Sequence, residues 1–155
     1  MNTGKLKAAG GLTGAIKESV HRAFSHVLAR KSELGVAREL ETSDLHVEVV
    51  NLLGNNMDME IGIGFFVACL SALRRAPVAQ GLLALGDMSV QGNIKPVMSL
   101  VEPLRVAMDN GAKRALIPVE NKRQFLEVSP DVLEHVDPVF YGDPRQAAFK
   151  ALGIT

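Results

Sequence analysis

The chain has 155 residues, of which 47% are hydrophobic, which suits one domain with a single core and excludes extended disorder. Its 17 basic and 17 acidic residues cancel, so it lacks the excess positive charge that a stand-alone nucleic-acid binder needs to neutralise phosphates. The single cysteine, Cys69, excludes an internal disulfide and a cysteine metal cluster, and its apolar neighbours predict a small core residue.

No stretch reaches the ~20 consecutive apolar residues that a membrane span needs. The first residues lack the apolar segment of a secretory signal, and we therefore expect a cytoplasmic location. The chain contains no G-x-x-x-x-G-K-[ST] loop, which argues against an ATP site of that kind within it. Gly62-Ile63-Gly64 lacks the third glycine of a dinucleotide-binding loop, so that interpretation is disfavoured.

The first third of the chain predicts a strand, a helix and a second strand. Residues 5–12 form a weak strand candidate. The helix is predicted to begin after Thr13, which can serve as its N-cap, and to end at Gly35. Alternating apolar and polar residues over 45–49 predict a half-buried strand. The buried face of the helix is predicted from its apolar spacing: Ile16, Val20, Ala23 and Val27.

The middle of the chain predicts a buried helix followed by short extended segments. Residues 61–73 are apolar nearly all round, which indicates a central helix ended by Pro77. A short buried strand is predicted over 82–85. Residues 89–94 resemble a hairpin with a Gly-Asn turn at 92–93.

A third helix is predicted to begin between Ser99 and Pro103 and to end at residues 110–111. Two starts remain open, a capping box beginning at Ser99 or a cap at Glu102 with Pro103 as the first helical residue. Helical and extended segments alternate throughout, so we predict the α/β or α+β class, with one mixed sheet in one domain. The remaining elements are a strand at 115–117, a short helix from Pro118, an extended segment at 136–141, and a helix from Asp143-Pro144 to Gly153.

The spacing of several motifs carries a family resemblance. The motifs are K-E-S at 17–19, D-L-H-V-E-V at 44–49, G-N-N at 54–56, G-D-M-S-V-Q-G at 86–92 and L-I-P-V-E-N at 116–121. Together they resemble the C-terminal proteolytic domain of Lon-type ATP-dependent proteases, without a gap from Asp44 to Asn121. The resemblance implies the Lon proteolytic α/β fold, which in that family packs into six-membered rings beneath an ATPase module.

The chain departs from the family at the positions that carry its chemistry. The resemblance places Glu60 at the serine nucleophile and Pro103 at the lysine base, and it implies that these two positions lie close together. In the same correspondence, Gly62 matches the final glycine of the family's nucleophile motif, whereas Leu85 stands where the family has a threonine near the lysine. A serine–lysine mechanism needs a hydroxyl and an adjacent neutral lysine. We therefore expect no catalytic residues in this domain.

This expectation does not depend on one choice of register. No Ser, Thr or Cys occurs between Leu45 and Ala68, and no Lys occurs between Pro96 and Ala112. Shifting the correspondence by a few residues recovers neither a nucleophile nor a base.

The leading hypothesis is a non-proteolytic assembly domain that holds a ring, the hexamer of the family, together for an attached AAA+-type motor. The lost dyad suggests a similarity to the Lon-like proteins of bacteriophage-exclusion (BREX) defence systems. We expect the chain to be the C-terminal part of a longer protein whose upstream module binds ATP and Mg²⁺. No cofactor or metal is expected in this domain, and no membrane partner.

Two further hypotheses belong to other functional classes. The first is an ATP-dependent Lon-class serine peptidase with an unorthodox active site, in which Ser89 or Ser99 is a displaced nucleophile. The second is a DNA-associated module of the same complex, which requires the basic pairs at 113–114 and 122–123 to cluster.

Other polar residues have plainer interpretations beside the functional ones. His46 and Glu48 share one face of a strand, where a metal site or an acid–base pair competes with a polar face or a ring interface. Glu60 and Asp58 are more simply explained as loop or helix N-terminal charges than as a carboxylate pair. The pair at 74–75 ends a helix, where cations are favourable without any ligand. Both His21 and His26 are predicted to be solvated.

Overall fold

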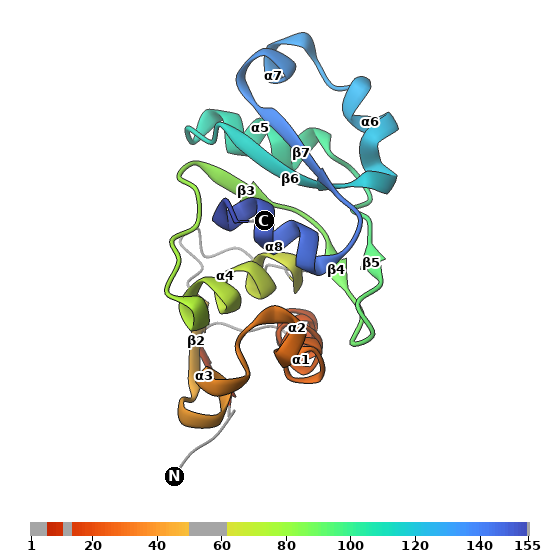
Figure 1. Cartoon of the computed structure of the whole chain (residues 1–155). Coiled ribbons are helices and arrows are strands. Elements are labelled where there is room, and N and C mark those ends of the chain that lie inside the picture. The colour runs from red at the N-terminus through yellow and green to blue at the C-terminus, as the bar shows by residue number, and fades with distance from the viewer. Residues whose placement is uncertain (1–5, 11–13, 50–61, 155) are drawn as a thin grey trace.

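The computed structural model of the chain describes residues 6–10, 14–49 and 62–154 (Figure 1). Helices and strands alternate along it. In order they are β1 (Leu6–Gly10), α1 (Gly14–Ala29), α2 (Lys31–Leu34), α3 (Ala37–Thr42), β2 (Leu45–Val49), α4 (Gly62–Arg74), β3 (Leu82–Ala84), β4 (Asp87–Met88), β5 (Ile94–Lys95), α5 (Val101–Asp109), β6 (Arg114–Pro118), the 3-10 helix η1 (Val119–Asn121), α6 (Lys122–Leu126), α7 (Pro130–His135), β7 (Asp137–Tyr141) and α8 (Pro144–Leu152).

Three ladders join the described strands. The largest is parallel, in the order β3-β6-β7, with Ala115 of β6 opposite Leu83 and Pro138. β1 pairs in parallel with β2, and β4 pairs with β5 in an antiparallel hairpin. The mixed helix-and-sheet class is therefore confirmed, although the described strands divide among three ladders. The weak strand at the start of the chain is also confirmed, and its partner is β2.

The parallel sheet lies between two layers of helices. Figure 1 shows α5, α6 and α7 on one side of it and α8 and α4 on the other. Alternate residues of β6 face opposite ways, as the two-residue period of a strand requires. Leu116 belongs to the apolar cluster of α1, α4 and α8, whereas Ala115 and Ile117 belong to the cluster of α5, α6 and α7. The core thus consists of two apolar clusters separated by the sheet.

The predicted stripe of α1 is confirmed, since all four of its residues are fully buried. The predicted end of this helix at Gly35 is wrong. The helix ends at Ala29, and Gly35 instead ends the short α2 with a φ of 73°. Arg30, with φ −116° and ψ 21°, interrupts the helical backbone between the two. The following helix, α3, has no counterpart in the prediction, and Thr13 lies outside the described residues.

His26 corrects a further expectation, because it is buried rather than solvated. Its Nδ1 atom donates a hydrogen bond to the Val90 carbonyl over 2.8 Å, and its ring packs against Phe66. A Cβ atom on Gly92 would lie 2.6 Å from the His26 ring, and Gly92 has a φ of 96°. The residue is therefore a buried link between α1 and the β4–β5 hairpin, whereas His21 is exposed as predicted.

The central helix is confirmed. α4 is buried on most sides and ends at Arg74, three residues before Pro77. Cys69 lies in this buried surface, and burial raises the pKa of its thiol to about 12, so it is the core residue predicted from its neighbours.

The β4–β5 hairpin and α5 begin differently from the predictions. The tight turn runs over 89–92, where Gly92 N donates to the Ser89 carbonyl, so the turn predicted at 92–93 is wrong. α5 begins at Val101 after Leu100, which provides no side-chain cap, so neither predicted cap is used. Pro103 is the third helical residue. There its missing N–H has no intrahelical acceptor to lose.

The last helix begins and ends at the residues that the sequence predicted. Asp143 Oδ1 accepts a hydrogen bond of 2.8 Å from the Gln146 amide at the start of α8, and Gly153 ends the helix with a φ of 67°. The strand predicted at 115–117 is one residue longer at each end, and α7 was not predicted. Within the described residues, no helix is long and apolar enough to cross a membrane.

Candidate degenerate peptidase site

The described part of the site lies where the start of α4, the segment 85–88 and the start of α5 approach one another. Glu60 and Asp58 lie outside the described residues, so the predicted proximity of Glu60 and Pro103 stays a prediction. Leu85 and Leu104 belong to the same buried apolar cluster, and Pro103 directly precedes Leu104 in α5. Two of the three predicted positions, Leu85 and Pro103, therefore lie in one layer of the fold.

Gly62, predicted to be the final glycine of the nucleophile motif, lies in the same region. It begins α4 and is buried, and a Cβ atom on it would lie 2.0 Å from Asp87 Oδ1 and 3.2 Å from the Met88 amide nitrogen. The next residue, Ile63, donates its backbone N–H to the Gly86 carbonyl over 3.3 Å. The start of α4 thus packs directly on the segment that follows Leu85.

The Leu85 side chain packs in the core and carries no group that could take part in catalysis. Its side chain is only 5% exposed and lies in the apolar cluster beneath α5. Its backbone is held on both sides, because its N–H donates to the Leu116 carbonyl and its carbonyl accepts from the Tyr141 hydroxyl. Burial, and secondarily the charge of Asp87, raise the pKa of Tyr141 above its ordinary value. The hydroxyl therefore stays protonated and acts as a donor.

Asp87 is the centre of a buried polar cluster that the sequence analysis missed. Its Oδ2 atom accepts from Ser19 Oγ at 3.1 Å and from Arg22 Nη2 at 2.5 Å. Arg22 also donates to the Met88 carbonyl and to Ser19 Oγ, each at 3.2 Å. The guanidinium compensates the carboxylate, which is only 1% exposed, and this pair joins α1 to β4.

The other carboxylate oxygen of Asp87 has no hydrogen-bond partner among the described residues. It faces Gly62 at the N-terminus of α4, where the positive end of the helix dipole favours a negative charge. Both Ser19 and Asp87 occur in motifs that carry the family resemblance, K-E-S and G-D-M-S-V-Q-G. That shared membership was the available signal for their pairing.

Ser19 is not an alternative nucleophile, although its hydroxyl bonds a carboxylate. It is fully buried, and Arg22 donates to its oxygen while its own proton goes to Asp87. Attack on a substrate requires an accessible oxygen with a base that can take its proton. The cluster therefore serves to anchor the site's backbone.

The two proposed displaced nucleophiles also lack a base. Ser89 Oγ accepts from the Asn93 amide at 3.0 Å within the hairpin turn. Ser99 is exposed before α5, and its side chain makes no hydrogen bond to any residue that the structure describes. Neither arrangement activates a hydroxyl.

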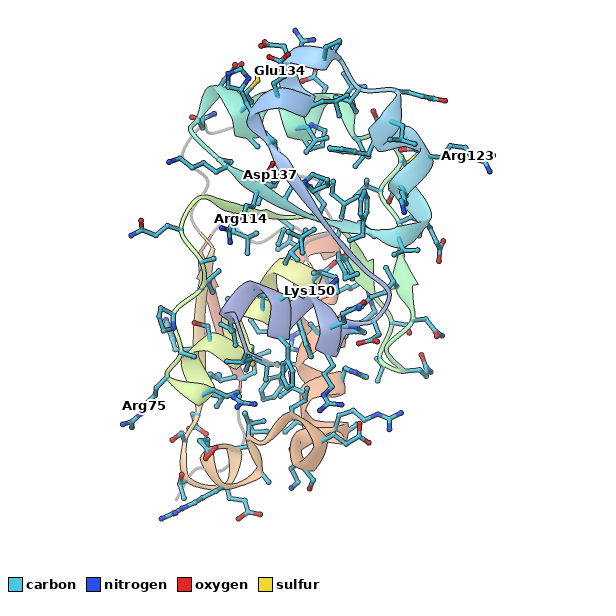
Figure 2. The ribbon with its side chains drawn as sticks, turned by 45° about the horizontal axis from the view of Figure 1, so that its top comes forward. Arg75, Arg114, Arg123, Glu134, Asp137 and Lys150 are labelled. Carbon is cyan, nitrogen blue, oxygen red and sulfur yellow. The ribbon has the colours of Figure 1, made fainter. Side chains whose placement is uncertain are left out.

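The remaining candidate metal-binding and nucleic-acid-binding residues do not gather at one place in the described structure. His46 is exposed on β2 opposite Lys7, and Glu48 pairs with Ala9 in the same ladder. The described residues contain no group of three His, Cys, Asp or Glu that could hold a metal ion. The basic pairs at 113–114 and 122–123 lie near opposite ends of β6, and Figure 2 shows Arg114 and Arg123 on different sides of the molecule.

The comparisons with known proteins agree with this arrangement. Residues 1–149 match the family model of the Lon protease (S16) C-terminal proteolytic domain. The chain belongs to this family. It is 29% identical to the Lon-like protease BrxL of Escherichia coli O9:H4 (strain HS), over 97% of the chain and 22% of that protein. It is 33% identical to the Lon protease of Escherichia coli (strain K12), over 86% of the chain and 17% of that protein.

A second BrxL, from Bacillus cereus (strain H3081.97), is 29% identical over 89% of the chain and 20% of that protein. The chain thus spans about a fifth of the length of these relatives. The resemblance inferred from the motifs, to the Lon proteolytic domain and to the BREX-associated Lon-like proteins, is confirmed. In this member of the family, the Leu85 and Pro103 side chains carry neither a hydroxyl nor a titratable group.

Proposed function

We propose that this Lon-family domain is non-proteolytic and acts as an assembly domain of an ATP-dependent, AAA+-type ring protein in the cytoplasm. Its ATP and Mg²⁺ would bind in an upstream module. Similarity to the BrxL proteins favours a role in phage defence. The observation that carries the proposal is Leu85, which stands at the family's threonine position and is buried in an apolar cluster beside α5.

The absence of reactive groups supports the loss of proteolysis. Pro103, at the position of the base, has no titratable group, and the sequence from Pro96 to Ala112 contains no lysine. Glu60, at the position of the nucleophile, would have to attack an amide as a carboxylate without a base, which is a poor route. The anchoring contacts around Asp87 remain, so the scaffold is kept without its chemistry.

An exposed apolar surface supports the assembly role. Met98 is 98% exposed just before α5, and Val119 is half exposed at the start of η1. The Asn121 side chain joins the two segments that carry these residues, because its Oδ1 accepts from Val97 N at 3.0 Å and its Nδ2 donates to Val97 O at 2.9 Å. Large apolar side chains exposed together at a surface are typical of contacts between proteins.

The proteolytic part of the proposal is tested with an unfolded-protein cleavage assay and a serine-reactive fluorophosphonate probe. We expect neither cleavage nor labelling. Labelling at one serine that disappears when this serine is changed to Ala would overturn the proposal and favour the alternative, an unorthodox serine peptidase. The Ser89→Ala and Ser99→Ala variants identify which hydroxyl is responsible.

The assembly part is tested on the complete parent protein with nucleotide. Light scattering should report a closed ring, most simply the hexamer of the family, in which a head-to-tail contact closes by rotation. A strictly monomeric parent protein under these conditions would contradict an assembly role. A DNA-associated function is less well supported, since Arg114 and Arg123, one from each basic pair, lie on different sides of the molecule (Figure 2).

A further inference from the structure

The end of α4 differs from the ends of three other helices. α2 and α8 are each followed directly by a glycine with positive φ, Gly35 and Gly153, and α5 is followed by Asn110 and then by Gly111, which also has positive φ. α4 is followed by Arg75, which has a φ of 53° and is the one non-glycine residue with positive φ in the described chain. Glycine adopts this left-handed conformation without the steric cost that a Cβ atom incurs. Arg75 therefore adopts a conformation that glycine would adopt at a lower steric cost.

Arg75 borders a hollow of about 610 Å³ between α3 and the end of α4. Three guanidinium groups and one carboxylate line it, so its local charge is positive although the chain as a whole is neutral. The polar lining residues are Arg38, Glu39, Thr42, Ser43, Arg74 and Arg75.

The three arginines differ in the hydrogen bonds and ring contacts that their side chains make within the protein. Arg74 is fixed, because its Nη1 donates to the Leu34 carbonyl at 3.1 Å and its guanidinium lies over the Phe149 ring. Arg38 and Arg75 are exposed, and their side chains form no ion pair or hydrogen bond with the described residues. Figure 2 shows Arg75 projecting from the end of α4 away from the body of the molecule. The guanidinium groups of Arg38 and Arg75 thus keep N–H donors that no described residue engages, in the same hollow that Arg74 lines.

We propose that this hollow binds a dianionic phosphate monoester, such as the terminal phosphate of a small phosphorylated molecule. A guanidinium presents a planar fork of N–H donors that matches phosphate oxygens in a bidentate arrangement. The three arginines exceed Glu39 by two positive charges, which fits the charge of −1.5 to −2 that a phosphate monoester carries at about pH 7. A carboxylate or a phosphodiester carries only one negative charge. This site is independent of the proposed assembly role.

The Arg75→Gly variant tests the proposal, because it should increase thermal stability and weaken phosphate binding. Because glycine adopts a φ of 53° freely, the variant should raise the thermal unfolding midpoint of the chain. The same variant should weaken binding of inorganic phosphate, followed by ³¹P NMR titration, by roughly tenfold, since one charge-assisted bidentate contact is lost. A purely structural residue would change the midpoint without changing phosphate binding, and that result would overturn the proposal.

Matched variants and ligands sharpen the test. Arg38→Gln should weaken phosphate binding to a similar extent, whereas Arg114→Gln, on the distant β6, should leave it unchanged. Adenosine monophosphate should compete with inorganic phosphate, and chloride at the same ionic strength should not. Equal competition by duplex DNA with unphosphorylated ends would contradict the assignment to a monoester. Equal binding by the Arg75→Gly, Arg38→Gln and Arg114→Gln variants would contradict the site itself.

Discussion

Gly62 and Asp87 are packed so closely that a Cβ atom on Gly62 would lie 2.0 Å from Asp87 Oδ1. The carboxylate cannot retreat easily, because its other oxygen is held by Ser19 and Arg22. This contact joins the start of α4 to β4, the strand that follows Leu85. It leaves no room for a side chain at position 62.

The Gly62→Ala variant should therefore destabilise the domain by about 1–3 kcal/mol, the usual cost of forcing an extra methyl into a packed site. Gly64→Ala is the matched control in the same helix. Its Cβ would meet only the Ala84 Cβ, at 3.8 Å, and alanine is the better helix former. Urea unfolding followed by circular dichroism measures both variants. Equal stabilities would contradict the tight contact.

Removing either partner of the Arg22–Asp87 pair should have unequal effects. Arg22→Met leaves a buried carboxylate without its counter-charge and should cost roughly 2–3 kcal/mol of unfolding free energy. Asp87→Asn keeps the shape and an acceptor oxygen, while the partly exposed Arg22 can turn to solvent, so about 1 kcal/mol is expected. The double variant should lose less than the sum of the two. A loss for Arg22→Met no larger than that for Asp87→Asn would contradict the dependence of the buried carboxylate on Arg22.

Local sequence patterns predicted a helix or strand correctly where its formation depends mainly on residues within that same element. The α1 stripe, the apolar α4 and the Asp143 cap each depend on residues close together in the chain. The break at Arg30 and the additional helix α3 depend on packing against distant elements, such as the Arg74 hydrogen bond to the Leu34 carbonyl. The pairing of Ser19 with Asp87 spans 68 residues, so no local pattern reveals it. His26 was misjudged for the same reason, because its acceptor is 64 residues away.

Alkaline pH should weaken the fold through two buried acids. Burial raises the pKa of Cys69 from 9.0 to about 12 and that of Tyr141 upward from 10.0. In the unfolded chain these groups lose their protons at their ordinary values while the folded chain keeps them, so stability is fully present below about pH 9 and falls as pH rises. The expected slope is about 1.4 kcal/mol per pH unit for each group.

The Cys69→Ala variant separates the two contributions. It should start from a lower stability because a buried side chain is truncated, but its stability should fall much less steeply than that of the wild type between about pH 9 and 10, where the thiol accounts for most of the proton loss in the unfolded chain. Denaturant unfolding at a series of pH values measures the slope. A variant with the wild-type slope in this interval would contradict the assignment to Cys69.

Restoring the serine alone should not restore proteolysis. Glu60→Ser supplies a hydroxyl without a base, and such a hydroxyl is a weak nucleophile. Adding Pro103→Lys and Leu85→Thr should recover at most traces of activity, because supporting residues must hold reacting groups to within about half an ångström. Hydrolysis of a fluorogenic peptide measures both variants. Activity from Glu60→Ser alone would reveal a base elsewhere.

The surface around Met98 and Val119 should be needed for assembly of the complete parent protein. Met98→Asp and Val119→Asp each place a charge where a contact would bury an apolar side chain, so each should shift the light-scattering mass from the ring toward smaller species. Because both side chains are exposed, the circular dichroism spectrum and unfolding midpoint should stay close to those of the wild type. Val90→Asp is the matched control, since Val90 is a similarly exposed valine in the β4–β5 hairpin turn. If Val90→Asp disrupts the ring and the other two variants do not, the contact is formed by the β4–β5 hairpin rather than by the surface around Met98 and Val119.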